Sequence, residues 1–200
     1  MANIDFSIYA VHTAFWSAFA VTRFLLRWRT RNEPTATAAP AEHAAVEAPF
    51  SRWLLGFHML AFALMYFAIG NAVIPNRVPI WFSGQRVTGA LVIAVGGALA
   101  AAALDCFRSW RFRAALDQDH ELATAGPFRV IRHPIYMGLN LLALGTAIWI
   151  PTVVMWIAVA LMVIGGDLRA RAEETLLERA FGRAYADYRA RTRRFLPAIY

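Results

Sequence analysis

Two polar strings in an otherwise apolar chain contain the residue types that could do chemistry. The first runs over residues 126–138 and contains an Arg-His-Pro triplet with a tyrosine two residues later. The second begins at Arg169 and includes the paired glutamates Glu173-Glu174. Charged groups beside hydrocarbon are expensive unless they find partners, so such residues next to membrane segments usually serve a function. These two strings are therefore the first candidates for a site.

The first string predicts an anion-binding helix start. Pro134 suits the first turn of a helix, because its missing N–H would have had no helical partner. The free backbone N–H groups and the positive dipole end at such a position favour an anionic group, for example a carboxylate. His133 stands directly before this helix and Tyr136 lies in its first turn. The alternative interpretation is that Arg132 and His133 only cap the helix and contact lipid headgroups.

The second string places Arg169 and Glu173 one helical turn apart, so that their side chains can meet on one face. The alternative here is an ordinary surface ion pair, which contributes little. Their position directly after an apolar run favours a role in a site. Phe181, Tyr185 and Tyr188 also recur at helical spacing, and a packing stripe or an interfacial aromatic belt explains them better than ligand binding does.

The composition indicates a membrane protein. The chain has 200 residues, of which 59% are hydrophobic and 16% charged, and its mean hydropathy is +0.45. Soluble domains have about 45–50% apolar and about 25% charged residues. The single cysteine, Cys106, excludes an internal disulfide and a cysteine-based zinc site, and we expect no metal. No motif surrounds His12 or His58, which we expect to be hydrogen-bonded inside the membrane.

A helix needs about 20 apolar residues to cross a bilayer. The sequence predicts an all-α integral membrane protein, a single domain over residues 1–200, with about five transmembrane helices. The first three occupy residues 1–105 with a flexible cytoplasmic linker at 27–50, and the half at 106–200 contains both polar strings. The third run is rich in Gly and Ala, which allows close helix contacts. Pro151 separates the last two runs, which we expect to form a tight hairpin, followed by a charged surface helix at 169–190. The five apolar runs are 4–26, 53–74, 87–104, 135–150 and 152–168.

The arginines predict the orientation. The net charge is +7 and every basic residue is Arg. Of the 20 arginines, 18 lie around the linker, between the third and fourth runs, or after the fifth run, and only Arg77 and Arg86 lie elsewhere. Cytoplasmic loops carry an excess of positive residues. The N-terminus is therefore predicted outside and the C-terminus in the cytoplasm, which explains the basic charge without nucleic acid as a partner.

Taken in order, the two strings resemble the isoprenylcysteine carboxyl methyltransferase family and its phospholipid-methylating relatives. The resemblance covers about residues 120–197, including His120-Glu121-Leu122-Ala123 upstream of the first string and Arg194-Phe195-Leu196-Pro197 at the end of the second. It implies an S-adenosylmethionine-dependent methyltransferase. The C-terminal half would enclose this cofactor between the membrane and a C-terminal cytoplasmic helix that caps the pocket.

The resemblance also implies roles for single residues. Arg169 would bind the methyl acceptor, and Glu173 would hold a polar group of the cofactor, so these two are the expected catalytic residues. Phe128 stands where the family often has tyrosine, so a hydroxyl is missing at that point. The remaining residues implied to line the cofactor are His120, Glu121, Leu122, Ala123, Phe128, His133, Pro134, Ile135 and Tyr136.

Methyl transfer from a sulfonium needs collinear alignment more than side-chain chemistry. A carboxylate is already ionised near neutral pH and needs only an arginine to place it and a dry site, which favours the carboxylate of an isoprenylcysteine-like or isoprenoid compound. A phospholipid amine or a small thiol remains as an alternative acceptor, and a non-catalytic membrane scaffold is a second alternative. NADPH-dependent sterol reductases share a half-fold related to that of these methyltransferases. The longer set of membrane spans that such reductases have is not visible in this sequence, which argues against a reductase. The all-arginine, alanine-rich composition indicates a bacterial inner membrane, where membrane lipids surround the protein; the oligomeric state stays open.

Overall fold

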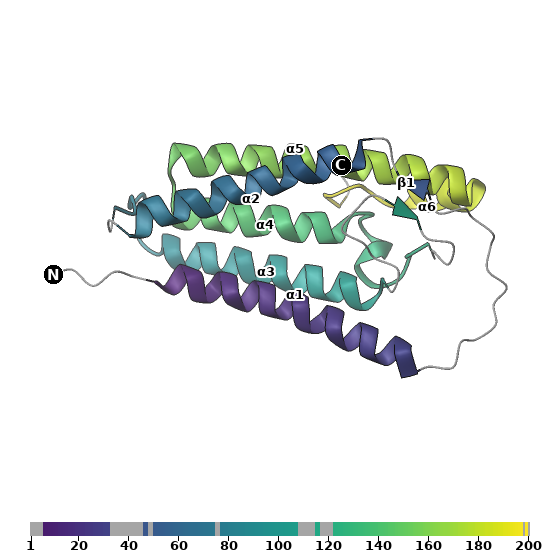
Figure 1. Cartoon of the computed structure of the whole chain (residues 1–200), viewed down its shortest axis with the longest axis horizontal. Coiled ribbons are helices and arrows are strands. Elements are labelled where there is room, and N and C mark those ends of the chain that lie inside the picture. Colours follow the sequence, from purple (N-terminus) through teal and green to yellow (C-terminus); the bar gives the residue numbers. More distant parts are fainter. Residues whose placement is uncertain are drawn as a thin grey trace.

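The computed structural model describes residues 6–32, 46–47, 50–74, 77–107, 115–116, 122–197 and 199, and within them the chain is an all-α membrane protein. Five long helices lie side by side and run in alternating directions, so the loops gather at the two ends of the bundle (Figure 1). A short 3-10 helix, η1, precedes the fourth helix, and a short sixth helix follows the fifth. The helices are α1 (Ser7–Asn32), α2 (Ser51–Val73), α3 (Gln85–Asp105), η1 (Gly126–Arg129), α4 (Pro134–Trp149), α5 (Val153–Phe181) and α6 (Arg183–Arg191).

Three of the described helices, α2, α3 and α5, are long and apolar enough to cross a membrane. Helix α1 has 26 residues, but its histidine and arginines lower its hydropathy. Helix α4 has 16 residues and is about 24 Å long at 1.5 Å per residue, which is shorter than a bilayer core of about 30 Å. Full crossing by α1 and α4, and the side on which the C-terminus lies, stay predictions.

The close helix contact predicted from Gly and Ala is made between α3 and α4. A Cβ added to Gly96 would lie 2.7 Å from the carbonyl oxygen of Gly138 and 2.8 Å from Cβ of Leu141. A Cβ added to Gly89 would lie 2.5 Å from the carbonyl oxygen of Gly145. Any side chain at these positions would push the two backbones apart, so the glycines set the distance at which α4 is held.

The predicted hairpin at Pro151 is confirmed. Helix α4 ends at Trp149, and the Thr152 hydroxyl caps α5 by accepting from the Met155 N–H at 3.2 Å. The prediction that the fifth apolar helix ends near residue 168, before a separate surface helix, is wrong. Helix α5 continues to Phe181, because neither glycine nor proline occurs between Arg169 and Gly182, whose φ of 47° interrupts it. The two polar residues at 169 and 173 are therefore rigidly joined to the membrane helix.

The connecting segments differ in part from the prediction. The linker was expected to begin at residue 27, but α1 continues to Asn32. Within the linker, β1 (Val46–Glu47) pairs antiparallel with β2 (Ala115–Leu116), with Val46 opposite Leu116. The stretch 75–85, with its proline and glycine residues, predicts a loop, and its described part before α3, residues 77–84, is not helical. The alternation of polar and aromatic residues after residue 105 predicts an interfacial helix, most of which lies outside the described residues.

A partly buried hydrogen-bond chain ties α1 to α2 and α4. The Trp16 indole N–H donates to the Tyr66 hydroxyl at 2.7 Å, and this hydroxyl lies 3.2 Å from Nδ1 of His12. Nε2 of His12 lies 2.9 Å from the Thr146 hydroxyl, which donates its own proton to the Leu142 carbonyl at 2.6 Å. His12 therefore has a partner at each ring nitrogen, as expected from the sequence.

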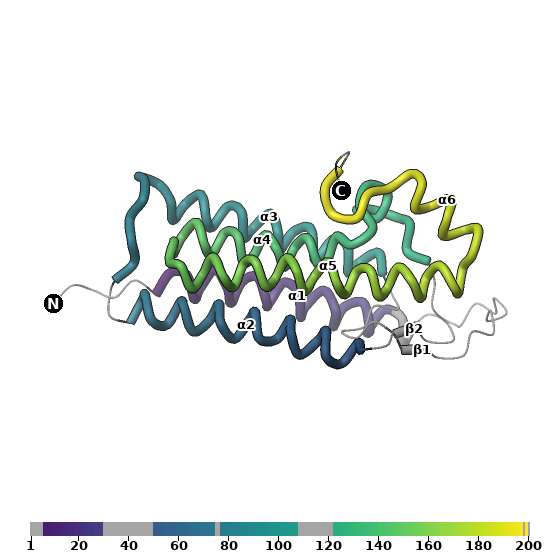
Figure 2. The backbone as a smooth tube through the Cα atoms, turned by 90° about the horizontal axis from the view of Figure 1, so that it is seen from above, coloured from purple at the N-terminus to yellow at the C-terminus, as the bar shows by residue number. Residues whose placement is uncertain are grey.

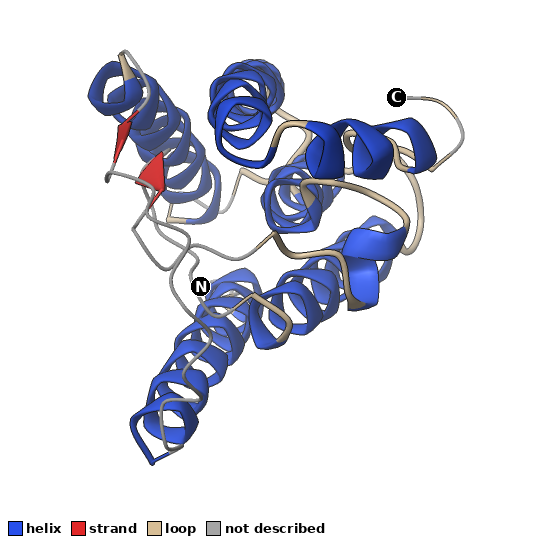
Figure 3. Cartoon of the chain, turned by 90° about the vertical axis from the view of Figure 1, so that its right-hand side faces the viewer, coloured by secondary structure: helices blue, strands red, loops and turns tan. Residues whose placement is uncertain are grey.

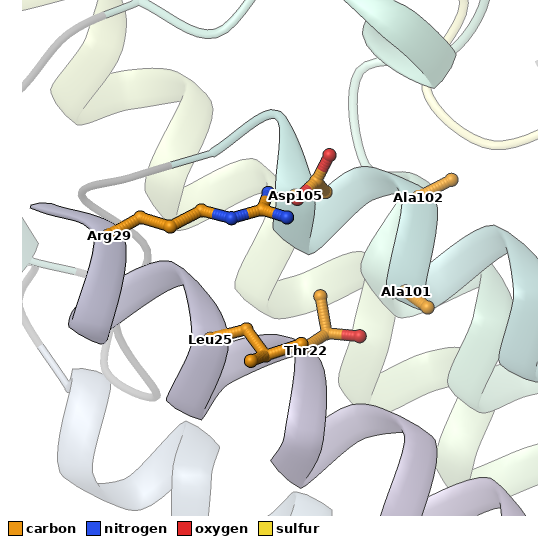
Figure 4. Close-up of a pocket in the computed structure, with 6 residues that line it drawn as sticks. All are labelled: Thr22, Leu25, Arg29, Ala101, Ala102 and Asp105. Carbon is orange, nitrogen blue, oxygen red and sulfur yellow. Dashed lines mark hydrogen bonds and ion pairs between the residues drawn. The ribbon is translucent and has the colours of Figure 1, made fainter.

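Helices α1 and α3 also meet at the end of the bundle where η1 lies. There an ion pair of 3.5 Å joins Arg29 to Asp105 across a shallow groove floored by Leu25, Ala101 and Ala102 (Figure 4). Both charged side chains are well exposed, at 60% and 59%, so the pair contributes little to stability. The packing of α1 therefore depends mainly on its buried face.

The C-terminal segment closes this end of the bundle, beside the start of α4 (Figures 2 and 3). Arg193 forms a parallel bridge with Ile131, and the Arg132 N–H donates to the Arg193 carbonyl at 2.7 Å. The His133 N–H donates to the Arg194 carbonyl at 3.1 Å. The two polar strings of the sequence are thus joined through their backbones.

Candidate active site

His133 stands at the N-terminal end of α4, with Pro134 as the first helical residue. The first hydrogen bond of this helix runs from the Met137 N–H to the His133 carbonyl at 3.0 Å, so the N–H groups of Ile135 and Tyr136 have no partner within the helix. The His133 side chain does not cap the helix. The interpretation of His133 as a simple cap is therefore wrong, and its ring is instead directed to the carboxylates of α5.

Glu174 is the centre of the ionic contacts at this end. Its carboxylate accepts from Arg132 Nε at 2.9 Å and from two nitrogens of Arg194, Nε at 3.1 Å and Nη2 at 2.7 Å. His133 Nε2 lies 3.3 Å from the same carboxylate. The Glu174 side chain is only 7% exposed. Such a buried carboxylate with several charged donors fixes the geometry of everything that it binds.

The contacts of Arg132 and Arg194 extend this cluster to the C-terminal segment. Arg132 Nη1 also donates to the Thr192 carbonyl at 2.6 Å, and Arg194 Nη1 donates to Asp167 at 3.0 Å. Sequence reasoning named the arginine of the Arg-His-Pro triplet only as a possible cap and gave Glu174 no role. The signal was present in the doubled glutamate, since two adjacent carboxylates on a helix point about 100° apart and serve different neighbours.

Glu173 faces Tyr136 and the Nδ1 side of the His133 ring. It accepts a hydrogen bond from the Tyr136 hydroxyl, and His133 Nδ1 lies 3.6 Å from its second oxygen. The rings of His133 and Tyr136 stack with centroids 5.8 Å apart. In contrast to its neighbour, Glu173 keeps 25% of its side chain exposed. This carboxylate can therefore accept a further hydrogen bond from a ligand, whereas Glu174 is enclosed by protein.

Arg169 is buried one turn earlier on α5, with 3% exposure. Its guanidinium lies over the Tyr136 ring, 4.9 Å from the centroid, within cation–π range. Tyr136 thus contacts Arg169 through its ring and Glu173 through its hydroxyl. A bare surface ion pair does not describe an arginine at this depth. The structure brings together four of the predicted site residues, His133, Tyr136, Arg169 and Glu173, and their roles toward cofactor and acceptor stay predictions.

The electrostatic environment favours a protonated His133. Burial lowers the pKa of the imidazole, but the hydrogen bonds and negative charges of Glu173 and Glu174 outweigh this effect, and the pKa is raised above its usual value. Both ring nitrogens face these two carboxylates, so His133 is held in place by the protein. The free N–H groups of the α4 N-terminus beside it suit an anionic group of a ligand.

Three of the other residues implied to line the cofactor, Ala123, Phe128 and Ile135, belong to an apolar cluster near the start of α4. Phe128 and Ile135 are buried with Leu104 in one cluster, against which Ala123 packs, and Phe128 contacts Phe107 with ring centroids 5.5 Å apart. Pro134 is buried and Leu122 is half-buried. His120 and Glu121 lie outside the described residues. Contact of these residues with a cofactor stays a prediction.

The aromatic residues of α6 serve packing, as predicted. Tyr185 and Tyr188 are buried, and the Tyr188 hydroxyl donates to the Phe128 carbonyl at 2.9 Å. Burial raises the pKa of both phenols, which stay neutral. The bond from Tyr188 ties α6 to η1, so the helix after Gly182 helps to hold the loop that leads to His133.

An apolar groove of about 480 Å³ runs along α4 and α5 next to the site. Its described lining includes Met137, Leu144 and Val163, and it ends at Phe195, whose ring lies 6.0 Å from that of His133. Neither Arg169 nor Glu173 belongs to this described lining. The groove therefore flanks the predicted catalytic pair and offers an apolar surface beside it.

Known proteins resemble this chain over the same region. Residues 85–184 match the family described as phospholipid methyltransferase (PEMT). Proteins of Oryza sativa subsp. indica and subsp. japonica, each named probable protein-S-isoprenylcysteine O-methyltransferase, are 26% identical over 144 residues, which is 70% of this chain and 74% of theirs. Protein-S-isoprenylcysteine O-methyltransferase B of Arabidopsis thaliana is 31% identical over 84 residues, 42% of this chain and 43% of the plant protein.

The fold and the site thus define an all-α membrane protein with a cluster of ionic and aromatic side chains at one end of its helices. Residues 85–184 are half of the chain and include most of this cluster, and the chain belongs to the phospholipid methyltransferase family. It is a membrane methyltransferase, and the family resemblance inferred from the two strings is confirmed.

Proposed function

We propose that this protein transfers the methyl group of S-adenosylmethionine to the carboxylate of a lipophilic acceptor, an isoprenylcysteine-like or isoprenoid compound. The observation that carries the proposal is the meeting of Arg169, Glu173 and His133 around one tyrosine ring at the end of α4 and α5. The names of the plant relatives support the acceptor class. The apolar groove beside the site supports a lipophilic molecule.

The donor groups fit the cofactor. S-adenosylmethionine has a carboxylate, an ammonium group and ribose hydroxyls. When bound, it supplies an activated methyl group on a sulfonium sulfur, and loss of this methyl group leaves a neutral thioether. The free backbone N–H groups at the α4 N-terminus suit the carboxylate. The partly exposed Glu173 can accept from a hydroxyl or an ammonium group, and Tyr136 fixes the orientation of that carboxylate by its hydrogen bond.

Arg169 is proposed to hold the acceptor. A guanidinium presents several N–H donors in one plane and can grip a carboxylate at two points. The Tyr136 ring supports the guanidinium from one side and restricts its motion. Burial of this arginine keeps water away from the bound carboxylate, which makes its oxygen a better nucleophile. No general base is needed, because a carboxylate is ionised before transfer.

The test uses substitutions at 169 and 173 with two separate measurements. We predict that Glu173→Ala weakens S-adenosylmethionine binding by about tenfold, as expected for loss of a hydrogen bond to a charged group, measured by titration calorimetry. We predict that Arg169→Ala leaves this binding within about twofold but lowers methyl transfer to N-acetyl-S-farnesylcysteine by at least about a hundredfold, because a buried charged donor is lost. Arg169→Lys should rescue only part, since lysine lacks the planar fork.

The matched controls are Arg171→Ala and Glu178→Ala, exposed positions on the same helix that bind other partners. Both controls should retain binding and transfer. Full activity of Arg169→Ala would refute the assignment of the acceptor. The description of the matched family gives a second candidate, methylation of a phospholipid amine, and vesicles of phosphatidylethanolamine with methyl-labelled cofactor test it in the same assay.

A further inference from the structure

His58 of α2 is completely buried, and one of its ring nitrogens has an unusual partner. Nε2 lies 2.8 Å from the sulfur of Met162 on α5. A thioether can only accept a hydrogen bond, so Nε2 has a proton. Among the described residues no group donates to Nδ1, although this atom is buried. A second proton on Nδ1 would leave a buried charge without a partner, so the imidazole is neutral and Nδ1 has a lone pair that no described group uses.

The other buried histidine of the membrane helices shows what a structural histidine looks like in this fold. His12 has the Tyr66 hydroxyl at one nitrogen and the Thr146 hydroxyl at the other. A buried polar atom without a partner carries a free-energy penalty, and each such atom in a native protein calls for an explanation. The contrast between the two histidines indicates that His58 is not retained for packing alone.

The position of His58 connects it to the candidate active site. Its ring stacks on the Phe62 ring with centroids 5.5 Å apart, and the centroid of the Tyr136 ring lies 6.1 Å from that of His58. The same tyrosine ring lies under the Arg169 guanidinium. Gly165 makes this arrangement possible, because a Cβ at that position would lie 3.1 Å from the Phe57 ring and 3.7 Å from Cγ of His58. His58 and Arg169 thus approach one side chain of the site from two different helices.

We propose that His58 belongs to the acceptor-binding wall of the site, where Nδ1 accepts a hydrogen bond from an N–H group next to the carboxylate that Arg169 holds. The inference rests on the proposed function and narrows its substrate class. A cation beside a neutral acceptor complements an N-acylated amino-acid end, in which a carboxylate and an amide N–H lie on the same carbon. A plain isoprenoid acid lacks such a donor. His58 moves no proton in this role and determines specificity.

Two probes test the proposal. N-acetyl-S-farnesylcysteine and S-farnesylthiopropionic acid have the same lipid chain and carboxylate, and only the first has the amide N–H. The wild-type protein should prefer the amide probe in kcat/KM by roughly three- to tenfold, the range of one net hydrogen bond. His58→Phe keeps the aromatic stack on Phe62 and should abolish this preference by lowering turnover of the amide probe alone. His58→Asn places an amide oxygen near the position that Nδ1 occupies in the wild-type protein and should restore part of the preference for the amide probe.

His12→Phe is the matched control, a buried histidine of the same bundle away from Tyr136. Any loss that it causes should be equal for both probes. Equal losses for both probes in His58→Phe, or no preference in the wild-type protein, would overturn the role of His58 while leaving the methyltransferase proposal intact. If His58→Phe does not fold, the wild-type preference and its change in His58→Asn decide the question. Absence of transfer to either probe, although the cofactor binds, would instead refute the proposed function, and this inference with it.

Discussion

Replacing Glu174 by alanine should loosen the end of the bundle more than any other single substitution on α5. The carboxylate binds Arg132, two nitrogens of Arg194 and His133, at distances of 2.7 to 3.3 Å. The side chains of Glu174, Arg132 and Arg194 are only 7%, 9% and 14% exposed. Removal of one partner of a buried ion pair costs about 3–5 kcal/mol, because it leaves the remaining charges without compensation.

That loss can be translated into a melting temperature. For a chain of this size, 1 kcal/mol corresponds to about 2–4 °C, so Glu174→Ala should lower the apparent Tm in detergent by roughly 6–20 °C. Backbone hydrogen exchange should show where the structure opens. The N–H groups of Arg132 and His133, which donate to the carbonyls of Arg193 and Arg194, should lose protection first.

Glu178→Ala provides the control on the same helix. Its ion pair with Arg189 is 3.4 Å long, and both side chains are about half exposed, so we expect a change of about 0–1 kcal/mol. Equal melting temperatures for Glu174→Ala and Glu178→Ala, or unchanged exchange at Arg132 and His133, would refute the view that Glu174 organises this end of the molecule.

Three further predictions follow from other parts of the molecule. The raised pKa of His133 means that its stabilising contribution is fully present below the unfolded pKa of about 6.5 and is lost as the pH rises through the folded value. The Tm of the wild-type protein should therefore fall with rising pH across this range, and His133→Gln should remove this part of the pH dependence. Gly96→Val should destabilise the protein by about 1–3 kcal/mol, because the side chain would overlap the Gly138 carbonyl, whereas Gly70→Ala, with open space around it, should be neutral apart from its helix propensity. A reporter that functions only in the cytoplasm should be active when fused to the C-terminus. Activity of a C-terminal reporter that functions only in the periplasm would refute the orientation predicted from the arginines.

Much of the membrane architecture could be predicted from composition and spacing. Apolar runs of sufficient length require helices, because a lipid environment offers no hydrogen-bond partners for exposed backbone. Pro151 separates two of these helices as expected, and the glycines of α3 allow the close contact with α4. The end of α5 could not be located, because hydropathy falls at Arg169 whereas helical hydrogen bonding continues until Gly182.

The site shows the same division. The spacing of Arg169 and Glu173, and the place of His133 and Tyr136 at a helix start, were visible in the sequence, because each lies within one turn of an element that can be recognised locally. Glu174 could not be assigned a role, since its partners Arg132 and Arg194 are 42 and 20 residues away and approach it only after the C-terminal segment folds back.

The sequence by itself thus determined the membrane class, the family resemblance and two local pairs, His133 with Tyr136 and Arg169 with Glu173, because these depend on apolar length, motif and local helical spacing. The packing of α4 against α5 brought the two pairs together. Only the tertiary structure decided which glutamate is enclosed and which remains partly open, since both have the same chemistry and differ by about 100° around α5. The same holds for the two membrane histidines. His12 and His58 are equivalent in the sequence, and helix packing alone gives one of them two partners and places the other against the Tyr136 ring.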